Sequence, residues 1–139
     1  MLDKLEAVFA SARAYLLREG LSETETVRRN VKGQRTRQFD ERAERIVIEQ
    51  CLAAFGEPIS FLSEECGEVR TGSGEPRFLF VVDPVDGSLN YARGVEACAT
   101  SIAVLPASAE RTVRNVTHAL VGNVFTGTVF VAERGRGVA

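Results

Sequence analysis

Two aspartates follow an apolar stretch of this chain. Residues 78–82 read FLFVV, Asp83 comes next, and Asp86 stands three residues later with Pro84 between the two acids. Apolar runs of this kind typically form central strands of a sheet, where an unpaired carboxylate is costly. The two carboxylates therefore either face solvent in a turn or bind a cation.

Three further acids stand at the ends of expected elements. Asp40 opens a helical pattern, and Glu64 and Glu65 end the strand-like run 58–65. Each has an ordinary structural explanation. An aspartate before a helix is typically an N-cap, and a glutamate pair at a strand end is typically solvated. The sequence Asp-Pro-Val-Asp-Gly can likewise form a plain β-turn.

Taken together, these acids indicate a metal and phosphate site. Hard divalent cations such as Mg²⁺ prefer carboxylate and carbonyl oxygens, and phosphoryl transfer uses such cations to gather charge on the attacking and leaving oxygens. Asp83, Asp86 and the carbonyl of Val85 could offer three oxygens from one tight turn. A helix that begins at Gly87 and Ser88 would direct free N–H groups at an anion.

Two familiar acidic sites do not fit this spacing. An EF-hand loop needs oxygen ligands at its first, third and fifth positions, and Val85 and Gly87 occupy the third and fifth here. Phosphatases of the haloacid dehalogenase type carry two aspartates that are two residues apart, whereas Asp83 and Asp86 are three apart. Walker A, H-E-x-x-H and G-x-S-x-G motifs are also absent from the sequence.

The elements that would hold these residues can be read from the hydrophobic pattern. Residues 21–39 are polar, basic and unpatterned, which indicates a helix tail or short strand leading into a mobile loop. Two helices followed mostly by strands predict an α+β fold with helices layered on a mixed sheet. The expected elements are helices over 2–19 and 40–55, strands over 58–65, 77–82, 98–105, 117–125 and 127–134, and a short helix over 87–94.

The overall composition limits the classes of partner. The chain has 139 residues, 45% hydrophobic and 26% charged, with a net charge of -2, which fits one globular domain. This charge gives no reason to expect nucleic acid or an anionic membrane as partner. Three cysteines without C-x-x-C spacing indicate reduced thiols in a cytoplasmic protein. The charged N-terminus is typical of neither a signal peptide nor a membrane span.

The stretch VVDPVDGSLNYARG, residues 81–94, resembles the signature D-P-[IVL]-D-G-[ST]-x-N-[FY] of the inositol monophosphatase family, which includes archaeal-type fructose-1,6-bisphosphatases. Three other segments are similar to family motifs. FLSEECGEV (61–69) resembles the strand-ending glutamate pair, KGQRTRQFDERAERIV (32–47) the lysine loop and helix-opening aspartate, and GTVFVAERGRGVA (127–139) the strand and turn after the site. The resemblance spans the chain but only about half of a usual member.

The resemblance implies a metal site of four residues. Glu64 and Asp83, with the Val85 carbonyl, would hold a first Mg²⁺ or Mn²⁺, and Asp83 and Asp86 would share a second. Glu64 would also help to position the attacking water. The implied substrate is a small phosphorylated sugar or inositol, such as inositol monophosphate or fructose 1,6-bisphosphate.

The resemblance also implies roles around the phosphate. The Ser88 hydroxyl would bond to Asp40, and this pair would help to take the proton from the water. The amides of Gly87 and Ser88 would hold the phosphate. Lys32 is a weaker match, on the loop that caps the metals, and Glu65 would act behind the metal ligands.

The chain departs from the family pattern in two ways. Phe39 stands where a threonine is common, and the chain has no tryptophan, whereas relatives carry a W-[DS] motif that completes the second metal site. We therefore expect residues 1–139 to be an N-terminal metal- and phosphate-binding domain without the C-terminal domain. The alternative function is a non-catalytic metal- or phosphate-binding or assembly module. Because the last strands would lack a cover, we expect a homodimer or higher oligomer.

Several other polar residues are interpreted without a catalytic role. His118 lies in a strand pattern, the cysteines are expected to pack in the core, and Tyr91 is expected to pack the short helix. Four arginines, which could also attract a phosphorylated substrate, are expected to form a solvated loop: Arg28, Arg29, Arg35 and Arg37.

Overall fold

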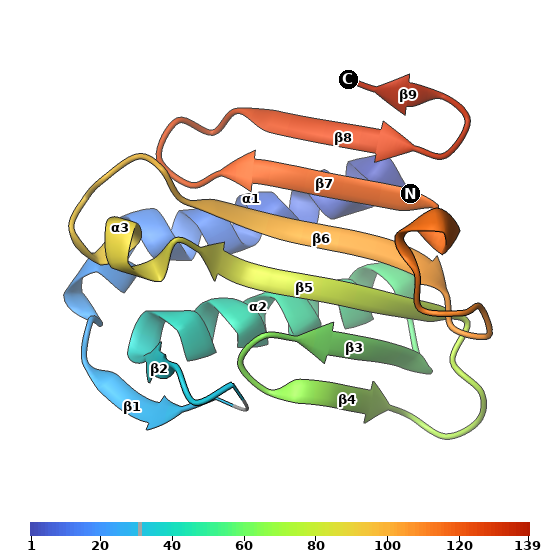
Figure 1. The fold of residues 1–139 in the computed structure, drawn as a ribbon, viewed down its shortest axis with the longest axis horizontal. Coiled ribbons are helices and arrows are strands. Elements are labelled where there is room, and N and C mark those ends of the chain that lie inside the picture. Colours follow the sequence, from blue (N-terminus) through green and yellow to red (C-terminus); the bar gives the residue numbers. More distant parts are fainter. Residues whose placement is uncertain (31) are drawn as a thin grey trace.

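A computed structural model describes residues 1–30 and 32–139 (Figure 1). In chain order the elements are α1 (Leu2–Arg18), η1 (Gly20–Ser22), β1 (Thr26–Arg29), β2 (Arg35–Arg37), α2 (Gln38–Phe55), β3 (Ile59–Ser63), β4 (Gly67–Thr71), β5 (Phe78–Asp86), α3 (Ser88–Ala92), β6 (Ala99–Pro106), η2 (Val113–Asn115), β7 (His118–Asn123), β8 (Val129–Glu133) and β9 (Gly137–Val138).

Seven strands form the main sheet, in the order β4-β3-β5-β6-β7-β8-β9. β3 and β5 run parallel, and the other neighbouring strands run antiparallel. Figure 1 shows α1 and α2 behind this sheet, both on one face. The predicted α+β fold with helices layered on a mixed sheet is therefore confirmed.

The main core lies between the two long helices and the sheet. α1 contributes Val8 and Phe9, and the facing sheet contributes Phe80 from β5 and Leu120 from β7. These side chains are almost fully buried, which is the main source of stability for such a layer. The approach is close at Gly122, where a Cβ atom would lie 2.5 Å from the Phe9 ring. A larger residue at this position would push α1 from the sheet.

A second buried cluster holds α3 against both helices. The Tyr91 ring of α3 is fully buried and lies 4.4 Å, centroid to centroid, from the Phe39 ring of α2. The Tyr91 hydroxyl donates a hydrogen bond of 2.7 Å to the carbonyl of Leu16 in α1. This confirms that Tyr91 packs the short helix. It also fixes the beginning of α3 relative to the beginning of α2.

The region before α2 differs from the sequence expectation. In place of the expected helix tail or short strand leading into a mobile loop, β1 and β2 form a separate antiparallel two-stranded sheet. α2 begins at Gln38 with Arg37 as its N-cap, two residues before Asp40. Asp40 is thus the third residue of the helix rather than its cap. Its side chain still serves the helix end, because it accepts a hydrogen bond from the Arg37 backbone N–H at 2.9 Å.

One face of the sheet carries no helix in the described part of the chain. Val81, Val121 and Phe130 stand on that face, because their strand neighbours Val82, Leu120 and Val131 pack in the helix-side core, and their exposures are 37%, 46% and 58%. A hollow of about 480 Å³ lies over the same face, bordered by small residues such as Ala103 and Ala119. No helix among the described residues is long and apolar enough to cross a lipid bilayer.

All three cysteines are free. Cys51 and Cys98 are buried, as expected for core residues, whereas Cys66 is only half-buried in the turn after β3. That turn also holds Glu64 and Glu65. The expectation that every cysteine packs in the core is therefore wrong for Cys66.

Candidate functional site

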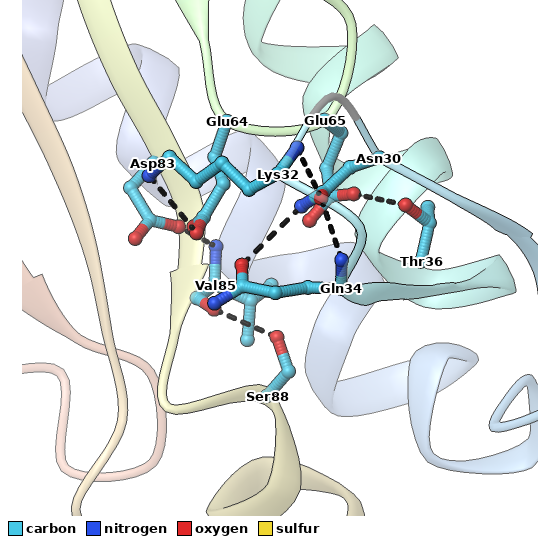
Figure 2. A network of polar contacts seen from close by, with 9 residues as sticks. All are labelled: Asn30, Lys32, Gln34, Thr36, Glu64, Glu65, Asp83, Val85 and Ser88. Atoms are coloured by element: carbon cyan, nitrogen blue, oxygen red, sulfur yellow. Dashed lines mark hydrogen bonds and ion pairs between the residues drawn. The ribbon is translucent and has the colours of Figure 1, made fainter.

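The acids after β3 and β5 meet because these two strands are parallel neighbours. Ser63, the last residue of β3, pairs with Val82 of β5, and the Glu64 N–H donates to the Val82 carbonyl at 3.3 Å. The carboxyl ends of parallel strands lie at the same edge, so Glu64 and Asp83 project from one place. Figure 2 shows their carboxyl groups next to each other, and these groups share a hydrogen bond.

A β-bulge brings Asp86 to the same side as Asp83. Asp83 pairs with Ser101 and Asp86 with Ala99, so three residue steps on β5 oppose two steps on β6. In a regular strand, residues three apart point to opposite faces, and the extra residue of a bulge reverses this. The expected strand end at residue 82 is therefore wrong, because β5 continues through the acids to Asp86. Pro84 is tolerated because it lies within the bulge.

Burial and the neighbouring acids favour the neutral form of the Asp83 carboxyl group. Burial, the hydrogen bond with Glu64 and the charges of Glu64 and Asp86 together raise the pKa of Asp83 to about 8. Its Oδ1 also accepts a hydrogen bond from the Val85 N–H at 3.2 Å, which favours the charged form but does not offset the other effects. Carboxyl groups gathered in this way need a positive charge to ionise together.

Lys32 supplies part of that charge from the β1–β2 hairpin. Its Nζ lies 3.6 Å from Glu64 Oε1, and its side chain remains 63% exposed. Asn30 shapes the turn that presents it, because Asn30 Oδ1 accepts hydrogen bonds from the N–H groups of Lys32 and Gln34, each at 3.0 Å. The structure thus places the Lys32 ammonium group beside Glu64.

The two oxygens of the Asp40 carboxylate accept hydrogen bonds from different groups. Oδ2 accepts the Arg37 N–H at the start of α2, and Oδ1 accepts the Ser88 hydroxyl at 2.7 Å. Ser88 Oγ also lies 3.0 Å from the Val85 carbonyl, so its single proton can turn to either acceptor. Asp40 is almost fully buried, and this burial raises its pKa despite the hydrogen bonds that favour its charged form.

Gly87 connects the bulge to α3 through a left-handed backbone conformation. Its φ is 86°, and a Cβ atom would lie 2.8 Å from the Ala97 carbonyl. Only glycine fits here without strain. The chain can therefore turn sharply, and α3 begins at Ser88, which lines the same cleft as the acids.

Glu65 points away from Glu64 and is buried. Its Oε2 accepts a hydrogen bond from the Thr36 hydroxyl of β2 (Figure 2). Burial, together with the nearby charges of Asp40, Glu64 and Glu44, raises the pKa of Glu65. The position of Glu65 agrees with an expected role behind the metal ligands rather than among them.

These residues surround one cleft of about 350 Å³. Among residues 1–30 and 32–139, no three His, Cys, Asp or Glu side chains are gathered closely enough to form a complete metal cage. The available donors still suit a hard cation, because the side chains of Glu64, Asp83 and Asp86 and the carbonyl of Val85 all offer oxygens. The cleft is lined by Asn30, Gln34, Arg35, Glu64, Glu65, Asp83, Val85, Asp86, Gly87 and Ser88.

The sequence interpretation missed three residues that build this site. Asn30, Gln34 and Thr36 belong to the segment 21–39, for which the sequence predicts a helix tail or short strand leading into a loop and no contribution of these three residues to a site. An available signal was the Asn-x-Lys-Gly pattern at Asn30, since Asn side chains and glycine typically form turns. The contact between Thr36 and Glu65 leaves no signal in the sequence, because it joins residues 29 positions apart.

The fold and the site together define a class of protein. In this class, acids at the ends of neighbouring sheet strands lie beside a hydroxyl group at the beginning of a helix. The profile of the inositol monophosphatase family matches residues 3–139. The chain belongs to the inositol monophosphatase family, which is a family of generally metal-dependent phosphatases.

Individual relatives agree with this assignment. The chain is similar to an inositol-1-monophosphatase from Rhizobium meliloti, with 32% identity over 135 residues that cover 96% of this chain and 47% of the relative. It is also similar to a fructose-1,6-bisphosphatase/inositol-1-monophosphatase from Methanothermobacter thermautotrophicus, with 37% identity over 91 residues that cover 62% of this chain and 32% of the relative. The chain thus spans about half or less of these curated relatives' length.

Solved structures show the same fold. The extragenic suppressor protein suhB from Bartonella henselae superimposes with a TM-score of 0.80 at 24% identity, covering 99% of this chain and 50% of that one. This likeness supports the arrangement of the sheet and helices.

Proposed function

We propose that this chain forms the N-terminal metal- and phosphate-binding domain of a cytoplasmic enzyme that hydrolyses a phosphate monoester of a small sugar or inositol with Mg²⁺ or Mn²⁺. The observation that carries this proposal is the hydrogen bond between Ser88 and buried Asp40 at the edge of the cleft that holds Glu64, Asp83 and Asp86. A purely structural element would need neither the pair nor the gathered carboxylates. Family membership supports a hydrolase.

The metal ligands in this proposal are oxygens of Glu64, Asp83, Asp86 and the Val85 carbonyl. A divalent cation bound there would neutralise charge on the phosphate oxygens. Lys32 would add a positive charge over Glu64 in the absence of the cation. The N–H groups of Gly87 and Ser88 would hold the phosphate at the beginning of α3.

The Ser88 and Asp40 pair would accept the proton of the attacking water, with Glu64 helping to position that water. When the Ser88 hydroxyl donates to Asp40, a lone pair of Ser88 Oγ is free to accept a proton from a water in the cleft. Asp40 can then receive the hydroxyl proton. Its raised pKa makes it a better base than an ordinary aspartate near neutral pH.

A phosphate-release assay tests the proposal directly. We expect purified protein to release phosphate from inositol 1-phosphate or fructose 1,6-bisphosphate when Mg²⁺ or Mn²⁺ is present, and we expect EDTA to stop the release. An Arg114→Gln variant, altered in the exposed helix η2 far along the chain from the site, is the matched control and should keep full activity. Absence of release from either ester, with metal bound, would contradict the enzymatic proposal.

The competing proposal is a non-catalytic metal- or phosphate-binding or assembly module. It is favoured by a relative named Nus factor SuhB from Pseudomonas aeruginosa, which is 33% identical over 103 residues. The two proposals differ in one result. The module would bind Mg²⁺ but release no phosphate, whereas the enzyme would bind Mg²⁺ and release phosphate.

The helix-free sheet face leads us to propose that the 139-residue chain associates with itself. Val81, Val121 and Phe130 expose apolar surface over that face, and such patches typically mediate protein contacts. We expect sedimentation velocity to show a dimer or larger species that Phe130→Glu shifts toward the monomer. Val113→Glu, at an 89% exposed position in η2, is the control and should leave the distribution unchanged. A wild-type protein that stays monomeric at high concentration would contradict this proposal.

A further inference from the structure

Glu65 is bonded to both strands of the β1–β2 hairpin. Its carboxylate accepts the Thr36 hydroxyl of β2, and its backbone carbonyl accepts Arg28 Nη1 of β1 at 2.9 Å. Glu65 itself belongs to the turn after β3, which also carries the proposed metal ligand Glu64. One residue therefore joins the hairpin to the strand end at which the acids gather.

Few of the described side chains in the two strands of the hairpin are buried against the body of the protein. All four residues of β1 are exposed, and Thr36 is the one fully buried residue of β2. Its base is fixed by the Gln38 N–H, which donates to the Glu25 carbonyl at 2.9 Å, and by its continuity with α2. The Thr36 contact with Glu65 is where the side of the hairpin meets the site.

Near the tip of the hairpin, Lys32 contacts Glu64, the residue that precedes Glu65. Asn30 holds the N–H groups of Lys32 and Gln34, and Lys32 Nζ lies 3.6 Å from Glu64 Oε1. Figure 2 shows Thr36 directed at Glu65 and Lys32 directed at Glu64. Glu65 thus fixes the side of the hairpin, and Glu64 pairs with Lys32 near its tip.

We propose that Glu65 and Thr36 are positioning residues, whose hydrogen bond holds the β1–β2 hairpin against the turn after β3 and thereby places Lys32 on Glu64. The role rests on the proposed function only in that Lys32 and Glu64 belong to its site. The Arg28 bond to the Glu65 carbonyl is the second fixing point. A buried carboxylate that loses its donor is costly, so removal of the Thr36 hydroxyl should move the two surfaces apart.

The contact between Lys32 and Glu64 can be measured by zero-length carbodiimide cross-linking of the metal-free protein, with the linked peptides quantified by mass spectrometry. The chain has two lysines, and the other, Lys4, donates to the Ala54 carbonyl at 2.7 Å rather than to an acid. A cross-link from Lys32 to Glu64 therefore reports the position of the hairpin tip. Thr36→Val should lower its yield by about threefold or more, the scale of one net hydrogen bond.

Three further variants decide the interpretation. Thr36→Ser keeps the hydroxyl and should restore the yield. Arg28→Met, on the exposed strand β1, removes the second fixing point without threatening the core and should lower the yield in the same direction. Thr117→Val loses a comparable hydrogen bond to the Val104 carbonyl at the start of β7 and should leave the yield unchanged.

An unchanged yield in both Thr36→Val and Arg28→Met would overturn the proposal, as would an equal fall in Thr117→Val. Thermal unfolding of each variant separates a local displacement from a loss of the fold. Because the cross-link forms without metal, substrate or turnover, a protein that proves inactive as a phosphatase still gives a decisive answer about Glu65 and Thr36.

Discussion

Ser88→Ala is expected to lower kcat for phosphate release by about 10²-fold or more, the usual effect of losing a general base. The Ser88 hydroxyl is the group that connects the cleft to buried Asp40, at 2.7 Å from its Oδ1. Alanine removes the hydroxyl but leaves the Asp40 bond to the Arg37 N–H intact. The loss should therefore appear in kcat, and thermal unfolding measured in parallel reports the cost of leaving buried Asp40 without this donor.

Two matched variants test whether Ser88 and Asp40 act as a unit. Ser88→Thr keeps the hydroxyl and should keep most of the activity. Asp40→Asn should lower kcat to a similar extent as Ser88→Ala, and the double variant should be little worse than either, because residues that act together are not additive. A Ser88→Ala enzyme with nearly normal kcat would mean that Asp40 only stabilises the beginning of α2.

Asp83→Asn is expected to abolish Mg²⁺ binding in titration calorimetry. Asp83 meets Glu64 directly and stands on the same side of the sheet as Asp86, so it is the carboxylate common to both proposed metal positions. An amide cannot supply the negative charge that a hard cation requires. Glu68→Gln, on β4 in an exposed ion pair with Arg111, is the control and should bind Mg²⁺ normally. Normal binding by Asp83→Asn would contradict the assignment of this ligand.

The same variant changes the dependence of stability on pH. Because the folded-state pKa of Asp83 is raised to about 8, above its unfolded value, this group favours the fold below about pH 4. That contribution declines as pH rises from about 4 and is lost as pH rises through about 8. The thermal unfolding midpoint of the metal-free protein should therefore fall between about pH 4 and pH 8. Mg²⁺ should reduce the fall, and Asp83→Asn should flatten it.

Much of the fold could be predicted from the sequence because its signals are local. The helical spacing of apolar residues in α1 and the apolar run of β5 each arise within one element. α1 forms where predicted, and β5 begins where predicted but extends beyond the apolar run. The motif around Asp83 also carries its glycine, since Gly87 has a backbone conformation that other residues avoid. Local signals in the sequence were therefore enough to predict the two long helices, the central strands, the fold class and the family to which the chain belongs, but not the short strands β1, β2, β4 and β9.

Tertiary structure alone decided how the candidate site is assembled. The parallel pairing of β3 with β5 places Glu64 beside Asp83, and the bulge turns Asp86 to the same side. Neither pairing nor register is encoded in a local repeat, because both depend on contacts between residues far apart in the chain. The end of β5 and the start of α2 were misplaced for the same reason. A strand continues through acidic residues only when its neighbour and its burial make that favourable.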